Sequence, residues 1–224
     1  MNDLADRSFD GRVERTRHRP LASGQLRPSH AFGFLAILLT IAAGLLWFLN
    51  PLTWILSPVA LLLAALYPFC KRFLHIPQLI LGLAFGWGGI MAWAAVRNDL
   101  QAGAWLLFAA TICWAIVYDT IYAIQDREDD LKIGVKSSAI LFGSYTWLGV
   151  GVFVSFMLLF LSLAGEISHL GTEYFIGLAL IAVLMGYQVI LLRLTITSKQ
   201  AFKLFKQHRW VGIIVLAGIL LGSR

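Results

Sequence analysis

Seven apolar segments make up most of this chain, and they constrain its fold more than any other feature. They cover approximately Ala31–Leu49, Leu52–Cys70, Pro77–Val96, Gly103–Tyr122, Ala139–Gly165, Tyr174–Leu192 and Trp210–Gly222. Most approach the ~20 residues that an α-helix needs to cross the hydrocarbon core of a bilayer. Only 13% of the residues are charged, whereas a soluble domain has roughly 25%. The sequence therefore predicts an all-α, polytopic membrane protein, with residues 1–224 forming one membrane-embedded domain.

The distribution of basic residues predicts how the segments are oriented. Sixteen of the 18 Lys and Arg residues lie in the leading segment or in alternate loops: Arg7, Arg12, Arg15, Arg17, Arg19, Arg27, Lys71, Arg72, Arg127, Lys132, Lys136, Arg193, Lys199, Lys203, Lys206 and Arg209. Only Arg97 and Arg224 fall on the other side. Because basic loops stay in the cytoplasm, we expect a multi-pass protein of a bacterial inner membrane with its leading segment inside. The first 29 residues are polar and basic, so no cleavable signal peptide is visible.

A dense group of carboxylates follows the fourth apolar segment. Five carboxylates lie within the 12 residues from Asp119 to Asp130. Tyr122, Asp126 and Asp130 are spaced four residues apart, which on a single helix places them in one row. Like charges this close repel one another unless a cation lies between them, and Mg²⁺ is typically held by a few carboxylates and by substrate phosphate. The alternative interpretation is a solvated helix end at the membrane interface.

A second row of the same spacing opens the chain. Asn2, Asp6 and Asp10 are again four residues apart. Asp6 and Asp126 are each followed directly by an arginine and, four residues on, by a second aspartate. The repetition favours a duplicated half-site that binds one polyanion from two sides. Both rows are expected on the cytoplasmic side, separated by four spans, which is consistent with an internal duplication.

Acidic rows beside many cations at a membrane surface suit a diphosphate carried on a lipid tail. The carboxylates would bind Mg²⁺, the metal would bridge phosphate oxygens, and basic side chains would neutralise the remaining charge. Lys71, at the end of the second span, could reach a phosphate, with Tyr67 one turn deeper. The alternative for Lys71 and Arg72 is ordinary anchoring at the interface.

Three stretches resemble the motifs of the UbiA-type aromatic prenyltransferases. Those motifs are two Asp-rich rows and a Tyr-x-x-x-Lys pair between them. The matching positions are Asn2, Asp6 and Asp10 in NDLADRSFDGR; Tyr67 and Lys71 in YPFCKRF; and Asp126 and Asp130 in DREDDLKIGVKS. The likeness runs through nearly the whole chain, and around the motifs it is closest to the members that prenylate 4-hydroxybenzoate in ubiquinone biosynthesis.

The resemblance implies a UbiA-like bundle of nine helices around a cavity that opens to the cytoplasm and to lipid. It implies Mg²⁺ held through both Asp motifs and two substrates, a polyprenyl diphosphate and 4-hydroxybenzoate. The expected partners are these two substrates and the lipid bilayer, and we expect no nucleic acid among them. The implied metal ligands are Asp6, Asp10, Asp126 and Asp130, of which Asp126 and Asp130 are expected to be catalytic. The implied substrate-binding residues are Asn2, Tyr67, Lys71, Arg72 and Tyr122.

The implied reaction transfers the polyprenyl group to the ring carbon ortho to the hydroxyl of the aromatic acceptor, 4-hydroxybenzoate. The allylic C–O bond ionises, the ring attacks the carbocation, and loss of a proton restores aromaticity. Arg72 is our candidate for the acceptor's carboxylate, because a guanidinium can meet a carboxylate with two parallel hydrogen bonds.

One departure from the family pattern concerns the start of the chain. The first Asp motif follows two membrane helices in the family, whereas here it begins at Met1. We therefore expect seven of the nine helices, an N-terminally incomplete domain, and an Asn2 on a free chain end.

Three rival functions remain open from the sequence. Other UbiA-type enzymes act in menaquinone, haem O or chlorophyll synthesis. A CDP-alcohol phosphotransferase also uses Asp rows and Mg²⁺, but in one continuous motif. An ion-coupled transporter would need carboxylates near the middle of the bilayer.

Overall fold

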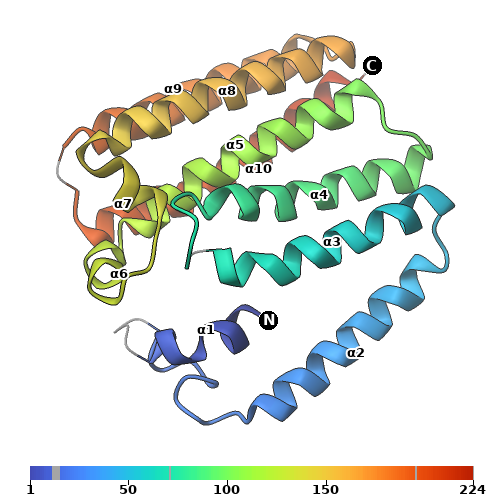
Figure 1. Ribbon diagram of the computed structural model, residues 1–224. Helices are drawn as coiled ribbons and strands as arrows, with labels where there is room; N and C mark the ends of the chain where they lie inside the picture. Colours follow the sequence, from blue (N-terminus) through green and yellow to red (C-terminus); the bar gives the residue numbers. More distant parts are fainter. Residues whose placement is uncertain (12–15, 71, 195, 224) are drawn as a thin grey trace.

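The computed structural model describes residues 1–11, 16–70, 72–194 and 196–223, which form ten α-helices and one 3₁₀ helix (Figure 1). The helices are α1 Asn2–Asp10, α2 Pro28–Leu46, α3 Pro51–Cys70, α4 Gln78–Arg97, α5 Ala102–Ala123, α6 Arg127–Ile133, α7 Ser138–Phe142, η1 Gly143–Tyr145, α8 Thr146–Ile167, α9 Thr172–Leu192 and α10 Ser198–Gly222. Within these described ranges, seven stretches are long and apolar enough to cross a membrane: α2, α3, α4, α5, α7 together with α8, α9 and α10. The predicted all-α, polytopic architecture is confirmed.

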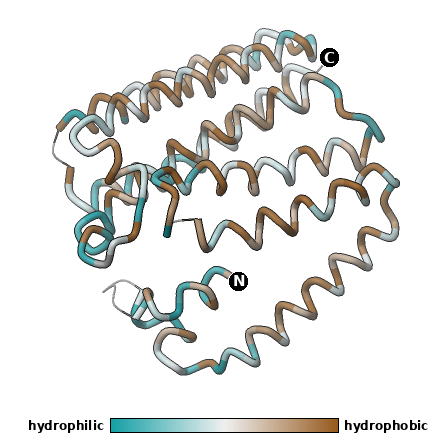
Figure 2. Tube along the Cα trace, in the orientation of Figure 1, coloured by the Kyte–Doolittle hydropathy of each residue, from teal (hydrophilic) through white to brown (hydrophobic). Residues whose placement is uncertain are grey.

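The short helices α1 and α6 are the polar part of the fold. Figure 2 shows the long helices as mainly hydrophobic, whereas hydrophilic residues gather at α1, at α6 and in the connections. Both short helices lie at the end of the bundle where α3 and α5 finish (Figure 1), and α1 contacts α3. The motif residues are therefore concentrated where the membrane helices meet an aqueous boundary.

The predicted segments agree with the helices to within a few residues, with two exceptions. The last segment was expected at Trp210–Gly222, but α10 already begins at Ser198. A capping box starts the helix. The backbone N–H of Gln200 donates to Thr197 Oγ1 over 3.3 Å, and the backbone N–H of Thr197 donates to Gln200 Oε1 over 2.7 Å. Hydropathy alone misses this beginning because the first turns carry lysines.

The second exception is the segment expected at Ala139–Gly165. The structure divides it into α7, η1 and α8. Gly143 lies at the division with a φ of 54°, a backbone conformation that residues with a Cβ rarely adopt. Thr146 Oγ1 donates to the Gly143 carbonyl over 2.7 Å and so stabilises the turn into α8.

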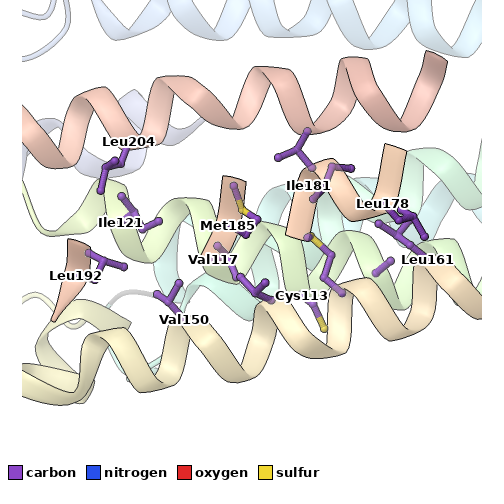
Figure 3. Close-up of a cluster of buried hydrophobic side chains, with 14 of the residues drawn as sticks. Cys113, Val117, Ile121, Val150, Leu161, Leu178, Ile181, Met185, Leu192 and Leu204 are labelled. Atoms are coloured by element: carbon purple, nitrogen blue, oxygen red, sulfur yellow. The ribbon is translucent and has the colours of Figure 1, made fainter. Parts of the chain in front are cut away.

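Helix α5 is the centre of the packing. Its apolar side chains, among them Cys113, Val117 and Ile121, meet α8, α9 and α10 in the main hydrophobic core (Figure 3). On its other side α5 packs closely against α4, because a Cβ at Gly82 would lie only 2.9 Å from the Ile112 Cα. Small residues that bring helix backbones together are typical of membrane bundles. The end of α5, which carries Asp119 and Tyr122, is therefore firmly positioned.

Helix α2 is much less engaged than the other long helices. It has no buried residue, and Figure 1 shows it diverging from α3 after the short connection between them. Asn50 in that connection donates through Nδ2 to the Ala94 carbonyl over 2.7 Å and accepts from the Thr53 amide over 3.0 Å. Asn50 therefore fixes the short connection to α3 and α4, while α2 itself does not pack along α3.

Candidate functional site

A polar cavity of about 200 Å³ lies where α1, the end of α5 and α6 meet. Its polar lining residues are Asn2, Asp10, Thr16, Arg19, Tyr67, Gln78, Asp119, Tyr122, Asp126, Asp130, Lys136 and Ser137. Four of these are carboxylates, and they come from two stretches that are far apart in the sequence. We call this space the acidic cavity. It brings together residues of both predicted Asp rows.

The first wall of the acidic cavity is α1. The predicted row is helical, since Asn2 to Asp10 form one continuous helix. The segment after α1 folds back on it: Thr16 Oγ1 donates to the Asp10 carbonyl over 3.0 Å, and Arg7 Nε donates to the Leu21 carbonyl over 3.1 Å. These bonds fix the row even though α1 itself is short.

Arg19, in the same returning segment, supplies a cation to this wall. Its Nη1 donates to Asp10 Oδ2 and to Asp3 Oδ1, each over 3.0 Å. The Asp10 side chain is only 9% exposed and that of Arg19 is 32% exposed, so the pair is partly shielded from water. One guanidinium thus offsets part of the negative charge at the end of α1.

The second wall is the junction of α5 and α6. The row of Tyr122, Asp126 and Asp130 was expected on one helix, and this is wrong, because α5 ends at Ala123 and Asp126 precedes the first residue of α6. A hydrogen bond between residues three apart ends α5: the backbone N–H of Gln125 donates to the Tyr122 carbonyl over 3.1 Å. Tyr122, Asp126 and Asp130 nevertheless all line the acidic cavity.

Aromatic rings extend from this wall into the bundle. The ring centroid of Tyr122 is 4.7 Å from that of Phe205 on α10, and Tyr118 lies 6.1 Å from the same ring. Trp114 follows at 5.6 Å from Tyr118. The acidic cavity is therefore bordered on one side by an apolar, aromatic surface.

The third wall is the segment between α6 and α7. The Ser138 amide donates to Gln78 Oε1 over 3.2 Å, and the Ser138 and Thr120 hydroxyls are 2.5 Å apart. Lys136 Nζ donates to the Phe73 carbonyl over 3.1 Å. These contacts join the segment to α4 and α5 and keep the ammonium group of Lys136 at the cavity.

The remaining predicted site residues lie elsewhere. Asp6 is fully buried on α1 and is not among the lining residues. Lys71 lies outside the described residues. The Arg72 guanidinium donates to the Ala5 carbonyl over 2.8 Å and stacks over the rings of Phe9 and Phe69, each 5.2 Å away. Arg72 therefore contacts α1 rather than the cavity, and its assignment to a substrate carboxylate stays a prediction.

The carboxylates of the acidic cavity suit a Mg²⁺ ion that is shared with a substrate. No group of three or more His, Cys, Asp or Glu residues among the described positions converges closely enough to hold a metal by itself. Mg²⁺ usually keeps several waters and is bound by one or two carboxylates plus substrate phosphates. The carboxylates of Asp10, Asp126 and Asp130 around one cavity fit that kind of binding, in which the substrate completes the shell.

Several lining residues were missed by sequence reasoning as site candidates, among them Arg19, Gln78 and Lys136. Arg19 lies in the basic stretch after the first row, where several arginines are equivalent in the sequence. Gln78 is an ordinary polar residue at the start of an apolar helix. The return of the 16–24 segment onto α1 brings Arg19 to the cavity, and the packing of the 134–138 segment brings Lys136 there and joins it to Gln78.

The sequence matches the model of the UbiA prenyltransferase family over residues 1–213. Among curated proteins, the chain is 49% identical over 222 residues to a 4-hydroxybenzoate octaprenyltransferase from Edwardsiella ictaluri, covering 99% of this chain and 77% of that one. It is 46% identical over 221 residues to the 4-hydroxybenzoate octaprenyltransferase from Alkalilimnicola ehrlichii, covering 99% and 75%.

Two solved structures are similar in fold. A UbiA homologue from Aeropyrum pernix K1, in its apo form, superposes with a TM-score of 0.81 at 27% identity, covering 98% of this chain and 82% of that one. A digeranylgeranylglyceryl phosphate synthase superposes with a TM-score of 0.74 at 25% identity, covering 99% and 78%.

Proposed function

The chain belongs to the UbiA prenyltransferase family, and we propose that it transfers a polyprenyl group from a polyprenyl diphosphate to 4-hydroxybenzoate, as in ubiquinone biosynthesis. The acceptor is taken from relatives at 46–49% identity that are named 4-hydroxybenzoate octaprenyltransferases. Membership of the family sets aside the phosphotransferase and transporter alternatives.

One structural observation carries the proposal. Carboxylates from α1 and from the α5–α6 junction line the same cavity, at the end of a bundle of membrane-length helices. A diphosphate is a polyanion that needs cations on several sides, while its polyprenyl tail needs an apolar environment. The acidic cavity, with its aromatic border, offers both within a short distance.

Asp10, Asp126 and Asp130 would hold Mg²⁺ together with the diphosphate of the donor, and the buried Asp6 would support them from within α1. When bound, the metal supplies electrostatic stabilisation of the diphosphate leaving group. The protein's own cations, Arg19 and Lys136, are placed to neutralise further phosphate oxygens, because both side chains line the cavity.

In the proposed reaction the allylic C–O bond breaks, and both of its electrons leave with the diphosphate. A C–C bond then forms between the allylic carbon and the ring carbon ortho to the hydroxyl, and that ring carbon loses its proton. The ring of Tyr122 lines the acidic cavity, where the carbocation would form, and the ring of Phe205 packs against that of Tyr122. Their faces are electron-rich and attract a cation, and they also exclude water from it.

The proposal includes a location. The basic connections at the end of the bundle that carries the acidic cavity support a cytoplasmic position for that end. The chain is a multi-pass membrane protein, and we propose that it lies in the bacterial inner membrane with this cavity facing inward.

The test is product formation in membranes that contain the expressed chain, with radiolabelled 4-hydroxybenzoate and a polyprenyl diphosphate. We expect a prenylated product that is lost on addition of EDTA and restored by excess Mg²⁺. A product that forms equally well in EDTA would refute the role of the metal. Transfer to another aromatic acceptor, with none to 4-hydroxybenzoate, would refute the proposed substrate.

A further inference from the structure

A second cavity, of about 350 Å³, opens at the same end of the bundle and shares no lining residue with the acidic cavity. Its polar lining is formed by Arg127, Arg193, Ser144 and Thr146, and its apolar lining includes Ile124 and Leu192. We call it the arginine cavity. It lies at the interface, because the α5–α6 junction, the start of α8 and the end of α9 all contribute to it.

The two arginines bring positive charge without any acid to balance it. Neither makes an ion pair with a described residue, and no carboxylate lines the arginine cavity. In the acidic cavity, by contrast, Arg19 is paired with Asp10. Two cations facing one space repel each other, so an anion that enters between them is stabilised by both.

Each guanidinium group lies against a neighbouring part of the fold. Arg193 stacks on Trp147, with its Cζ 4.7 Å from the ring centroid, a contact that leaves its N–H donors available. Arg127 lies against the turn at Gly143, where an added Cβ would be 3.8 Å from its Nη2. Ser144 follows in the same turn and also lines the cavity.

The chemistry of the lining suits an anionic head with an apolar tail. A guanidinium binds phosphate oxygens through two parallel hydrogen bonds, and the hydroxyl of Ser144 can add a third donor. The apolar lining continues to Leu194, which is 64% exposed at the end of α9. Basic pockets between membrane helices on the cytoplasmic side are typical sites for the headgroups of acidic phospholipids.

We propose that the arginine cavity binds the phosphate headgroup of an anionic phospholipid from the cytoplasmic leaflet. Arg127 and Arg193 hold the phosphate, and the glycerol and first methylene groups lie against Leu192 and Leu194. The site is separate from the one proposed for the diphosphate substrate, and it does not depend on the chain's catalytic activity.

The test is direct binding of radiolabelled phosphatidylglycerol to the full chain, purified in a non-ionic detergent. The test variant is Arg127→Gln with Arg193→Gln. The matched control is Lys203→Gln with Lys206→Gln, which removes the same charge from the start of α10, outside the cavity lining. We expect the arginine variant to bind about a hundredfold more weakly, the equivalent of losing two charge-assisted contacts, while the control binds like the unchanged chain.

Competitors identify the source of the anion. Unlabelled phosphatidylglycerol should displace the label, whereas phosphatidylcholine, inorganic phosphate and 4-hydroxybenzoate at equal concentration should not. Displacement by inorganic phosphate or 4-hydroxybenzoate would overturn the lipid assignment, and equal binding by the arginine variant would overturn the site. If that variant aggregates on gel filtration, Arg127→Lys with Arg193→Lys decides instead. It keeps the charge but loses the paired donors, and unchanged binding by it would contradict the proposed geometry.

Discussion

The Arg19 guanidinium donates to both Asp3 and Asp10, over 3.0 Å each, and so joins the first turn of α1 to its last residue. Asp10 is also one of the carboxylates proposed to hold Mg²⁺. Arg19 therefore balances charge on Asp10 that a bound metal ion would balance instead. Its guanidinium is then free to meet the diphosphate.

Replacing Arg19 should separate these two effects. Arg19→Gln removes a cation that competes for Asp10, so binding of Mn²⁺ as a spectroscopic substitute for Mg²⁺ should not weaken in the absence of donor. The KM for polyprenyl diphosphate should rise about tenfold, because one charged donor to phosphate is lost. Arg17→Gln is the control, since Arg17 is in the same segment but does not line the cavity. A rise in the KM for the aromatic acceptor alone would contradict this role.

Asp126 and Asp129 offer a matched comparison at the α5–α6 junction. Asp126 lines the acidic cavity, whereas Asp129 pairs with Lys132 over 3.2 Å and does not line it. Asp126→Asn should lower kcat/KM by roughly 10²–10³-fold, because the Mg²⁺ that stabilises the diphosphate leaving group loses a ligand. Asp129→Asn should change kcat/KM little. Both variants should elute normally on detergent gel filtration. Normal turnover by Asp126→Asn would exclude it from the metal site.

Replacing Arg72 tests the prediction that its guanidinium binds the carboxylate of the aromatic acceptor. In the structure Arg72 does not line the acidic cavity. Its guanidinium contacts Ala5 and the ring of Phe9, so Arg72→Gln should loosen α1 and raise the KM for the diphosphate donor. Because this hydrogen bond to the Ala5 carbonyl is exposed, its loss should also cost about 0.5–1 kcal/mol of stability. If only the KM for the aromatic acceptor rose, with stability unchanged, the carboxylate-binding role expected from the sequence would be established instead.

The sequence was sufficient for the bundle and for the approximate place of the site. Hydropathy locates the long helices because each is a continuous apolar run, and spacing places Asn2, Asp6 and Asp10 on one helix. The break after Ala123 was not predictable from spacing, since four-residue periodicity persists across a turn. The role of Arg19 depends on a chain reversal that has no periodic signal, and the capping box at Thr197 was hidden by the lysines that follow it.

The glycines of α4 provide a paired test of the packing that holds α5 in place. A Cβ at Gly82 would lie 2.9 Å from the backbone of Ile112, whereas one at Gly89 would meet nothing within 4 Å. Gly82→Ala should therefore destabilise the protein by about 1–3 kcal/mol. Gly89→Ala should be neutral or stabilising by up to about 1 kcal/mol through helix propensity. Thermal unfolding in detergent measures both, and equal effects would show that α4 and α5 are less closely packed.

A buried polar chain links α5, α9 and α10 behind the aromatic border of the cavity. Trp114 Nε1 donates to His208 Nδ1 over 3.0 Å, and His208 Nε2 lies 3.1 Å from Gln188 Oε1. His208 and Gln188 are almost fully buried. His208→Leu removes a bond from each of its two polar partners and should cost about 1–3 kcal/mol of stability.

The decisive variant is the double replacement. Gln188→Leu with His208→Leu removes both buried polar groups, so its loss of stability should be smaller than the sum of the two single losses. His75→Leu, in the connection between α3 and α4, should instead add to His208→Leu independently. Additivity of the Gln188 and His208 replacements in thermal unfolding would show that the two side chains are not energetically coupled.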